Sequence, residues 1–274
     1  MKNVNLEKMM QAQFDLAKFW LTLAISSGIV VLLIDIFVVV ANQWSTFLVF
    51  GAALLAVLNS VFLWRSDRLR ETAEMMLRKF EMYKSLGWEI SAREIANLLA
   101  AAPSSVKEAA RSGEQYKYFA STRNKDPRKL LENLEESTWW SKHQAKRMSK
   151  YVAAFGISML TIAFITLVFA LQSALSASTS DSIARIMISI IVFMLSGGYI
   201  RLAFDYNLFA NQAHDIEEIA FRLRQEDKIS EVEAIKLFHN YQIDRANSPL
   251  LPSWLWKIMS KELNDLWNER LSQD

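Results

Sequence analysis

The chain has 274 residues, of which 52% are hydrophobic and 22% charged, and its formal net charge is only +2. So small a net charge favours neither a nucleic-acid partner nor an acidic substrate. Because the chain has no cysteine, disulfides, thiolate chemistry and cysteine-ligated zinc or iron–sulfur sites are excluded. High hydrophobic content beside many charges predicts apolar blocks separated by charged ones, as in a membrane protein with soluble segments.

The first segment, residues 1–18, mixes acidic and basic side chains before any apolar run begins. It has no short apolar region that ends in a small-residue cleavage site. We therefore expect no removable signal peptide.

Four apolar runs follow, at residues 19–41, 47–64, 151–173 and 183–204. Each is near the roughly 20 residues that a helix needs to cross about 30 Å of hydrocarbon. Three of them carry at most one charge, which argues against the alternative of buried soluble helices. The fourth contains two arginines near its ends, and such side chains can extend to opposite interfaces. The sequence predicts an all-α membrane protein with four transmembrane helices, arranged as two hairpins with short tips.

The orientation follows from lysine and arginine, which cluster before the first run, after the second and before the third. The two hairpin tips carry neither residue, so we expect both termini and the long middle segment in the cytoplasm and the two short tips outside. The predicted parts are a cytoplasmic N-terminus (1–18), hairpin 1 (19–64), a helical cytoplasmic insert (65–150), hairpin 2 (151–206) and a helical cytoplasmic tail (207–274).

The insert and the tail have opposite net charge. The insert holds eighteen basic and twelve acidic residues, a net of +6, and the tail holds eight and twelve, a net of −4. Two readings are open: the segments dock on each other, or the basic excess of the insert faces anionic lipid. Within the insert, Ser91 and Glu94 predict a capping box, Gly87 a helix end, and Asp126 a helix N-cap.

The stretch "LENLEESTWWSKHQAKR" (131–147) raises the question of catalysis, because Glu136 and His143 lie on one side of a predicted helix. Their Cα atoms would be about 10.5 Å apart, and the three histidines of the chain show no metal-binding spacing. We expect that the chain is not an enzyme and binds no metal or cofactor. We interpret Trp139, Trp140 and His143 as a packing seam, that is, as side chains that pack against neighbouring cytoplasmic helices. Trp254 and Trp267 belong to an apolar face of the last helix, which either packs on the other cytoplasmic helices, the favoured reading, or lies on the membrane.

Polar residues within the apolar runs are costly and usually have a partner or a role. Asp35 and Arg185 both lie near the outer ends of their runs and are expected to pair, with an ion pathway as the alternative. Asn59 and Arg201 are the other intramembrane polar residues, and Asn59 suits either close helix packing or a pore lining.

Two pieces, "FEMYKSLGWEISAREI" (80–95) and "YFASTRNKDPRKLLENLEESTWWSKH" (118–143), together with the order of spans, insert and tail, resemble the SMODS-associated four-transmembrane effector family of bacterial antiphage defence. The resemblance implies an inner-membrane effector that is paired with a cyclic-nucleotide synthase, responds to a nucleotide signal and disrupts the membrane by homo-oligomerising or forming a pore. No nucleotide-binding residue of the family is identifiable in this chain.

A cluster of basic residues near the central loop is the one candidate ligand site that the sequence suggests without reference to the family. It consists of Arg123, Lys125, Arg128 and Lys129, which form either an anion-binding patch or, the plainer reading, a solvated surface. The competing function is a non-enzymatic membrane scaffold or accessory subunit that recruits a cytoplasmic protein.

Overall fold

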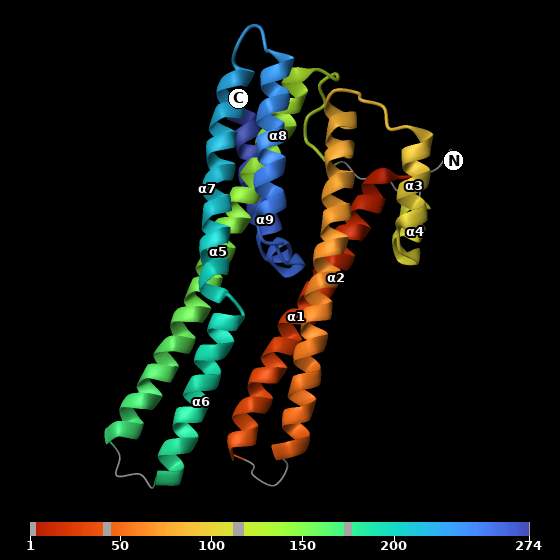
Figure 1. The fold of residues 1–274 in the computed structure, drawn as a ribbon. Coiled ribbons are helices and arrows are strands. Elements are labelled where there is room, and N and C mark those ends of the chain that lie inside the picture. The colour runs from red at the N-terminus through yellow and green to blue at the C-terminus, as the bar shows by residue number, and fades with distance from the viewer. Residues whose placement is uncertain (1–3, 41–44, 112–117, 173–176, 274) are drawn as a thin grey trace. The chain divides into compact units, whose positions relative to one another are not determined.

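The computed structural model describes residues 4–40, 45–111, 118–172 and 177–273. Within these ranges every regular element is a helix and no strand occurs, which confirms the predicted all-α fold. Four stretches of helix, in α1, in α2, in α5 and across α6 and α7, are long and apolar enough to cross a membrane. The helices (Figure 1) are α1 (Leu6–Val40), α2 (Ser45–Ser85), α3 (Ala92–Ala101), α4 (Ser104–Arg111), α5 (Pro127–Gln172), α6 (Ala177–Ser196), α7 (Tyr199–Arg224), α8 (Glu231–Asn247) and α9 (Ser253–Gln273).

The chain divides into two compact units. The charged unit comprises Met1–Lys18, Asp67–Lys146 and Asn207–Asp274, and the apolar unit comprises Phe19–Ser66 and Arg147–Tyr206. The predicted insert and tail thus share one unit, and the predicted hairpins share the other. Four helices, α1, α2, α5 and α7, contribute residues to both units.

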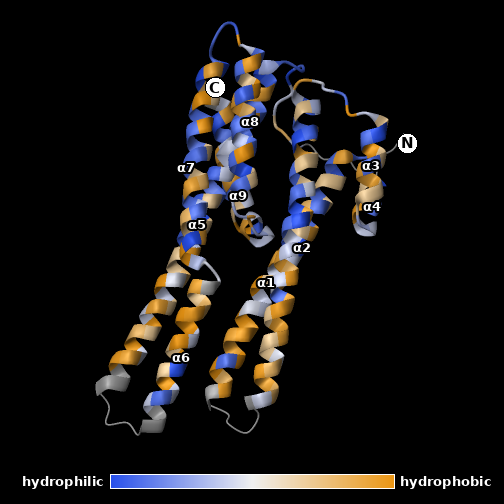
Figure 2. Cartoon of the chain, in the orientation of Figure 1, coloured by the Kyte–Doolittle hydropathy of each residue, from blue (hydrophilic) through white to orange (hydrophobic). Residues whose placement is uncertain are grey.

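The apolar unit has a small internal core and a hydrophobic exterior. Leu32 of α1, Ala163 of α5 and Ile190 and Met194 of α6 form the buried cluster. Large apolar side chains point outward, among them Phe50, which is 75% exposed. The helices of this unit are coloured mainly as hydrophobic in Figure 2. A water-soluble unit rarely exposes so much contiguous apolar surface, whereas lipid solvates it well.

The fourth predicted span, 183–204, is not one continuous helix. α6 ends at Ser196 and α7 begins at Tyr199, with a turn at Gly197 and Gly198 between them. Gly198 has φ of +62°, which L side chains rarely adopt, and a Cβ on Gly197 would lie 2.9 Å from the carbonyl oxygen of Phe193. The predicted fourth span is confirmed, since the helical stretch from Ser180 to Arg224 is long and apolar enough to cross a membrane, and two adjacent glycines add a turn that apolar content alone does not indicate.

The charged unit has its own core, built from the predicted N-terminal segment and the predicted insert. Met9 and Met10 of α1 and Phe80 of α2 pack with residues of α3, α4 and the loop before α5. Further buried members of this cluster are Met76, Leu77, Leu98, Ala102, Val106, Ala110 and Phe119. This core fixes the short helices α3 and α4 on α1 and α2.

The predicted helix signals of the insert are confirmed. The Ser91 side chain accepts a hydrogen bond from the Glu94 backbone, and the Glu94 carboxylate accepts one from the Ser91 backbone N–H. α2 ends two residues before Gly87, whose φ is +80°. Asp126 accepts from the backbone N–H of Lys129 at 2.6 Å, at the start of α5. Parts of the predicted hairpin tips (42–44 and 174–176) and of the central loop (112–117) lie outside the described residues.

Candidate functional site

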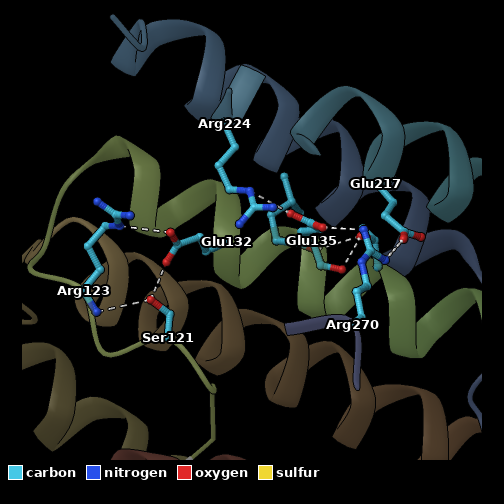
Figure 3. Close-up of polar contacts among 9 residues, drawn as sticks. Ser121, Arg123, Glu132, Glu135, Glu217, Arg224 and Arg270 are labelled. Carbon is cyan, nitrogen blue, oxygen red and sulfur yellow. Dashed lines mark hydrogen bonds and ion pairs between the residues drawn. The ribbon is translucent and has the colours of Figure 1, made fainter. Parts of the chain in front are cut away.

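A network of buried ion pairs joins α5, α7 and α9 within the charged unit (Figure 3). Glu135 of α5 lies 3.3 Å from Arg224 of α7 and 2.5 Å from Arg270 of α9. Arg270 also lies 2.5 Å from Glu217 of α7, which in turn is 2.5 Å from Lys142 of α5. The Glu135 and Glu217 side chains are almost fully buried. Each buried carboxylate thus has two cationic partners, as removal from water requires.

The insert and the tail are joined by this network. Glu135 and Lys142 belong to the predicted insert, and Glu217, Arg224 and Arg270 belong to the predicted tail. The reading that the two segments dock on each other is therefore the one that the structure shows.

A cavity of about 470 Å³ adjoins the network. Its wall includes Arg123 and Glu132, which pair at 2.9 Å, and Ser121, whose hydroxyl donates to Glu132 at 2.6 Å (Figure 3). The indole Nε1 of Trp267, also in the wall, has no hydrogen-bond partner within the described structure. The charged groups in this wall are already paired, so the cavity offers few groups for a ligand.

The four residues of the predicted anion patch have separate intramolecular partners. Arg123 pairs with Glu132, and the Lys125 ammonium lies 4.2 Å from the centre of the Tyr83 ring. The side chains of Arg128 and Lys129 donate to the backbone carbonyls of Glu226 and Arg123, at 2.7 and 2.6 Å. Only Arg123 of the four lines a cavity that adjoins the network. An anion at this surface would compete with these contacts.

The tryptophans of the predicted packing seam meet residues of α9. Trp139 lies 5.1 Å from Trp267 and 4.7 Å from His143, measured between ring centroids, and Trp140 lies 4.7 Å from Trp256. Trp254 differs from the other members because its side chain is 44% exposed. The structure thus brings together Trp139, Trp140, His143 and Trp267, and places Trp254 at the surface of α9.

Glu136 and His143, the pair considered for catalysis, have different contacts and do not meet at one site. The Glu136 carboxylate accepts a hydrogen bond from the backbone N–H of Ala120 at 2.8 Å, and the His143 ring packs edge-on against Trp139. In the described ranges, no group of three or more potential metal ligands lies close enough together to hold an ion.

A second buried polar cluster, on α2, α5 and α8, was not predicted. Arg245 pairs with Glu74 at 3.3 Å, and Gln242 donates to Glu81 at 2.6 Å. The Tyr241 hydroxyl donates to the carbonyl oxygen of Ser137 at 3.2 Å and lies 2.7 Å from Ser141 Oγ. Burial raises the pKa of Tyr241 to about 12, so its hydroxyl stays protonated at neutral pH.

A sequence signal for this cluster existed. Glu74 and Glu81 are seven residues apart, on one side of α2, and both adjoin the apolar residues Ala73, Leu77 and Phe80. Acidic residues seven apart beside an apolar stripe indicate carboxylates at the edge of a core, which need cationic or amide partners.

Among the polar residues of the apolar unit, Asn59 of α2 bridges to α1. Its Nδ2 donates to the carbonyl oxygen of Ala24 at 2.5 Å and to Ser27 Oγ at 3.0 Å. Gly28 lies against the same side chain, since a Cβ built on it would be 3.4 Å from Asn59 Nδ2. The contact favours the interpretation of Asn59 as a residue of close helix packing.

The predicted pair of Asp35 and Arg185 does not form. Arg185 lies 2.8 Å from Asp181, four residues earlier on α6, and Arg201 lies 3.4 Å from Asp205 on α7. A partner four residues away on the same helix is reached without a contact between helices, which explains the error. Asp35 has no ion pair within the described part of the chain.

Comparison of the chain with known protein families, curated proteins and solved structures gives no match, so its function is inferred from its own geometry.

Proposed function

We propose that this chain is a membrane effector of the bacterial antiphage type. In this proposal the charged unit binds a nucleotide signal or a protein partner, and the apolar unit then disrupts the inner membrane by oligomerising or opening a pore. The observation that carries the proposal is that α1, α2, α5 and α7 each contribute residues to both units.

Shared helices provide a physical route for a signal. The main-chain hydrogen bonds of a helix run without interruption along its length, so a shift at one end moves the other end as well. A ligand that binds one arrangement of α1, α2, α5 and α7 better than another shifts the population toward that arrangement. No separate hinge or linker is needed between the binding event and the apolar unit.

The carboxylate of Asp35 supports a membrane activity beyond anchoring. Asp35 lies within an apolar run of α1, half-buried, and has no ion pair in the described residues. A charge at such a position is costly and is usually retained for a role in a pathway or in contact with a partner. A second copy of the chain or a water-filled path would satisfy it.

The orientation in this proposal rests on charge. Lysine and arginine flank the apolar runs on the side of the termini and of the insert, so we place the charged unit in the cytoplasm. A cytoplasmic signal would then reach the charged unit directly.

The test is dye release from liposomes that contain the purified 274-residue chain, with cyclic di-AMP and cyclic GMP–AMP as probes. The proposal predicts that at least one probe increases leakage, and that leakage rises with the number of protein molecules per liposome. Asp35→Asn is expected to change the rate or the ion selectivity. Asp181→Asn, which removes an exposed carboxylate of the same unit, is the control and is expected to behave as the wild type.

The result that contradicts the proposal is an absence of leakage at every protein density, together with unchanged membrane potential in bacterial cells that express the chain. That result would favour the second candidate, a scaffold that recruits a cytoplasmic protein. One observation supports this candidate: Ile258 and Leu266 of α9 are 61% and 46% exposed, although Leu255 and Leu263 of the same helix are buried. Exposed apolar side chains of this kind suit a protein partner.

A further inference from the structure

A second cavity, of about 530 Å³, lies wholly within the charged unit. Residues of α1, α2, α5, α7, α8 and α9 form its wall, together with the loops before α5 and α9. Its volume falls within the roughly 300–1,000 Å³ that is usual for sites of small molecules. Six aromatic side chains line it: Phe14, Tyr118, Phe119, Trp140, Phe209 and Trp256.

The aromatic wall offers faces for stacking. Trp140 of α5 and Trp256 of α9 lie 4.7 Å apart between ring centroids, at an interplanar angle of 41°. Tyr118 and Phe119 meet edge to face, 4.8 Å apart. Planar rings of a ligand stack on such side chains with little dependence on the identity of the ring.

The charged groups of the wall favour an anion. Four cationic side chains line the cavity, against three carboxylates, those of Asp15, Glu74 and Glu136. Two of these carboxylates have partners within the chain, since Glu74 pairs with Arg245 and Glu136 accepts from the backbone of Ala120. The cations are Lys18, Arg70, Arg245 and Lys257. Arg245 pairs with Glu74, and Arg70 donates to the backbone carbonyls of Arg245, Ala246 and Ser248, so the excess of positive charge available to a ligand is one or two groups.

Lys257 is the cation best placed to serve a ligand. It follows Trp256 on α9, is exposed, and has no ion pair within the described residues. An aromatic face and a cation adjacent on one helix turn match a ligand in which a planar ring and a negative charge are close together. A cationic ligand would stack equally well but would meet the excess of basic groups.

We propose that this cavity binds a small anion that carries a planar ring, with Trp256 as a stacking surface and Lys257 as a charge partner. In the proposed function, this cavity is where the signal binds. The assignment rests on the proposed function only for the biological identity of that signal. Binding to the cavity is independent of whether the apolar unit permeabilises a membrane.

The experiment is equilibrium dialysis of the purified chain in nanodiscs. AMP, cyclic di-AMP and flavin mononucleotide are the probes, adenosine supplies a ring without charge, and inorganic phosphate supplies charge without a ring. We expect saturable binding of at least one ring-bearing anion, weaker binding of adenosine and phosphate, and an affinity that falls as salt concentration rises.

Matched variants on α9 locate the site. Trp256→Ala removes a stacking partner and is expected to weaken binding roughly 5-fold to 150-fold. Trp254→Ala is its control, because Trp254 is on the same helix and equally exposed, at 44% against 43%, but does not line the cavity. Lys257→Gln is expected to lower the affinity and to make the affinity less dependent on salt concentration. Lys261, which does not line the cavity, is the control, and Lys261→Gln is expected to change neither quantity.

Three outcomes would overturn the assignment. One is that no ring-bearing anion binds; another is that phosphate alone binds as tightly as the ring-bearing anions. The third is that Trp254→Ala and Trp256→Ala weaken binding equally. Dialysis does not depend on leakage, so the two proposals can fail separately. Binding without leakage would refute the proposed function and support the site. Leakage without binding at the cavity would support the proposed function and refute the site.

Discussion

Replacement of Glu135 by glutamine is expected to destabilise the charged unit far more than the same replacement of Glu132, one turn earlier on α5. Glu135 is 97% buried and is shared by Arg224 and Arg270, which come from two other helices. Glu132 pairs with Arg123, whose side chain is 45% exposed. Both substitutions remove one charge and keep the side-chain shape, so they differ mainly in what remains unpaired.

The magnitude follows from burial. Loss of one partner from a buried ion pair costs about 3–5 kcal/mol, because the remaining charge stays uncompensated. Arg224 and Arg270 keep 20% and 29% side-chain exposure, so water recovers part of this cost and we expect a loss of about 2–3 kcal/mol. Glu132 is 18% exposed, but its partner Arg123 is 45% exposed and remains solvated when the carboxylate is lost, so this pair is worth about 0–1 kcal/mol. The unfolding equilibrium should therefore shift roughly 30-fold to 150-fold for Glu135→Gln and at most about 5-fold for Glu132→Gln.

The assay is unfolding of the purified chain in detergent by added SDS, followed by tryptophan fluorescence. Trp267 reports on the network directly, because the Arg270 guanidinium lies 5.3 Å from the centre of its ring. Equal losses in the two variants, or no loss for Glu135→Gln, would refute the reasoning that burial makes this network contribute more to stability than the Arg123–Glu132 pair does.

Three further predictions concern other parts of the chain. Asn59→Leu removes the hydrogen bonds to α1 and should lower stability by about 0.6–1.7 kcal/mol, whereas Ser60→Ala, whose hydroxyl bonds only to its own helix at Ala56, should have little effect; the SDS titration compares them. Gly197→Ala should lower the thermal midpoint, because the added Cβ meets the Phe193 carbonyl, and Gly51→Ala, which has open space, should not. The Lys79 ammonium and the Ser91 backbone lower the pKa of Glu94 to about 2, so its stabilisation of α3 is full above its ordinary pKa of 4.5 and disappears as pH falls through 2. Hydrogen exchange of α3 should be faster in Glu94→Gln than in the wild type at pH 6, still faster by a smaller margin at pH 3, and equal if the account of this carboxylate is wrong.

Features that depend on composition over a long window were predictable from the sequence. The four apolar runs follow from the cost of placing charge in hydrocarbon, which leaves the same signature whatever the neighbouring helices are. Helix ends at Ser91, Gly87 and Asp126 were predictable because capping uses contacts within a few residues.

Features that depend on contacts between distant segments could not be predicted from the sequence. Opposite net charge left docking of the insert and the tail as one of two open readings, and it did not indicate which side chains make the contact. Lys142 and Glu217 pair as the net charges suggest, but most of the buried ion pairs use the minority charges of each segment. Glu74 and Glu135 come from the basic insert, and Arg245 and Arg270 come from the acidic tail. Net charge sums side chains that mostly face solvent, whereas docking depends on the few that are buried.

The candidate site shows the same limit. The basic residues around Arg128 were noticed because they are adjacent in sequence, but the second cavity takes its wall from segments as far apart as Lys18 and Lys257. Spacing along one chain segment cannot reveal such a site. The turn at Gly197 was missed for a local reason: small residues in an apolar run suit close helix packing as well as a turn, and hydropathy does not separate the two.

The most direct test of this account is side-specific labelling of single cysteines, which is clean because the natural chain has none. Exposed positions in the insert, the tail and the apolar unit are available at Glu108, Glu269 and Asp181. In sealed, oriented membranes, a membrane-impermeant maleimide should label Glu108→Cys and Glu269→Cys from the same side and Asp181→Cys from the opposite side. Labelling of Glu108→Cys and Glu269→Cys from opposite sides would contradict a single charged unit on one face of a membrane that the apolar unit spans.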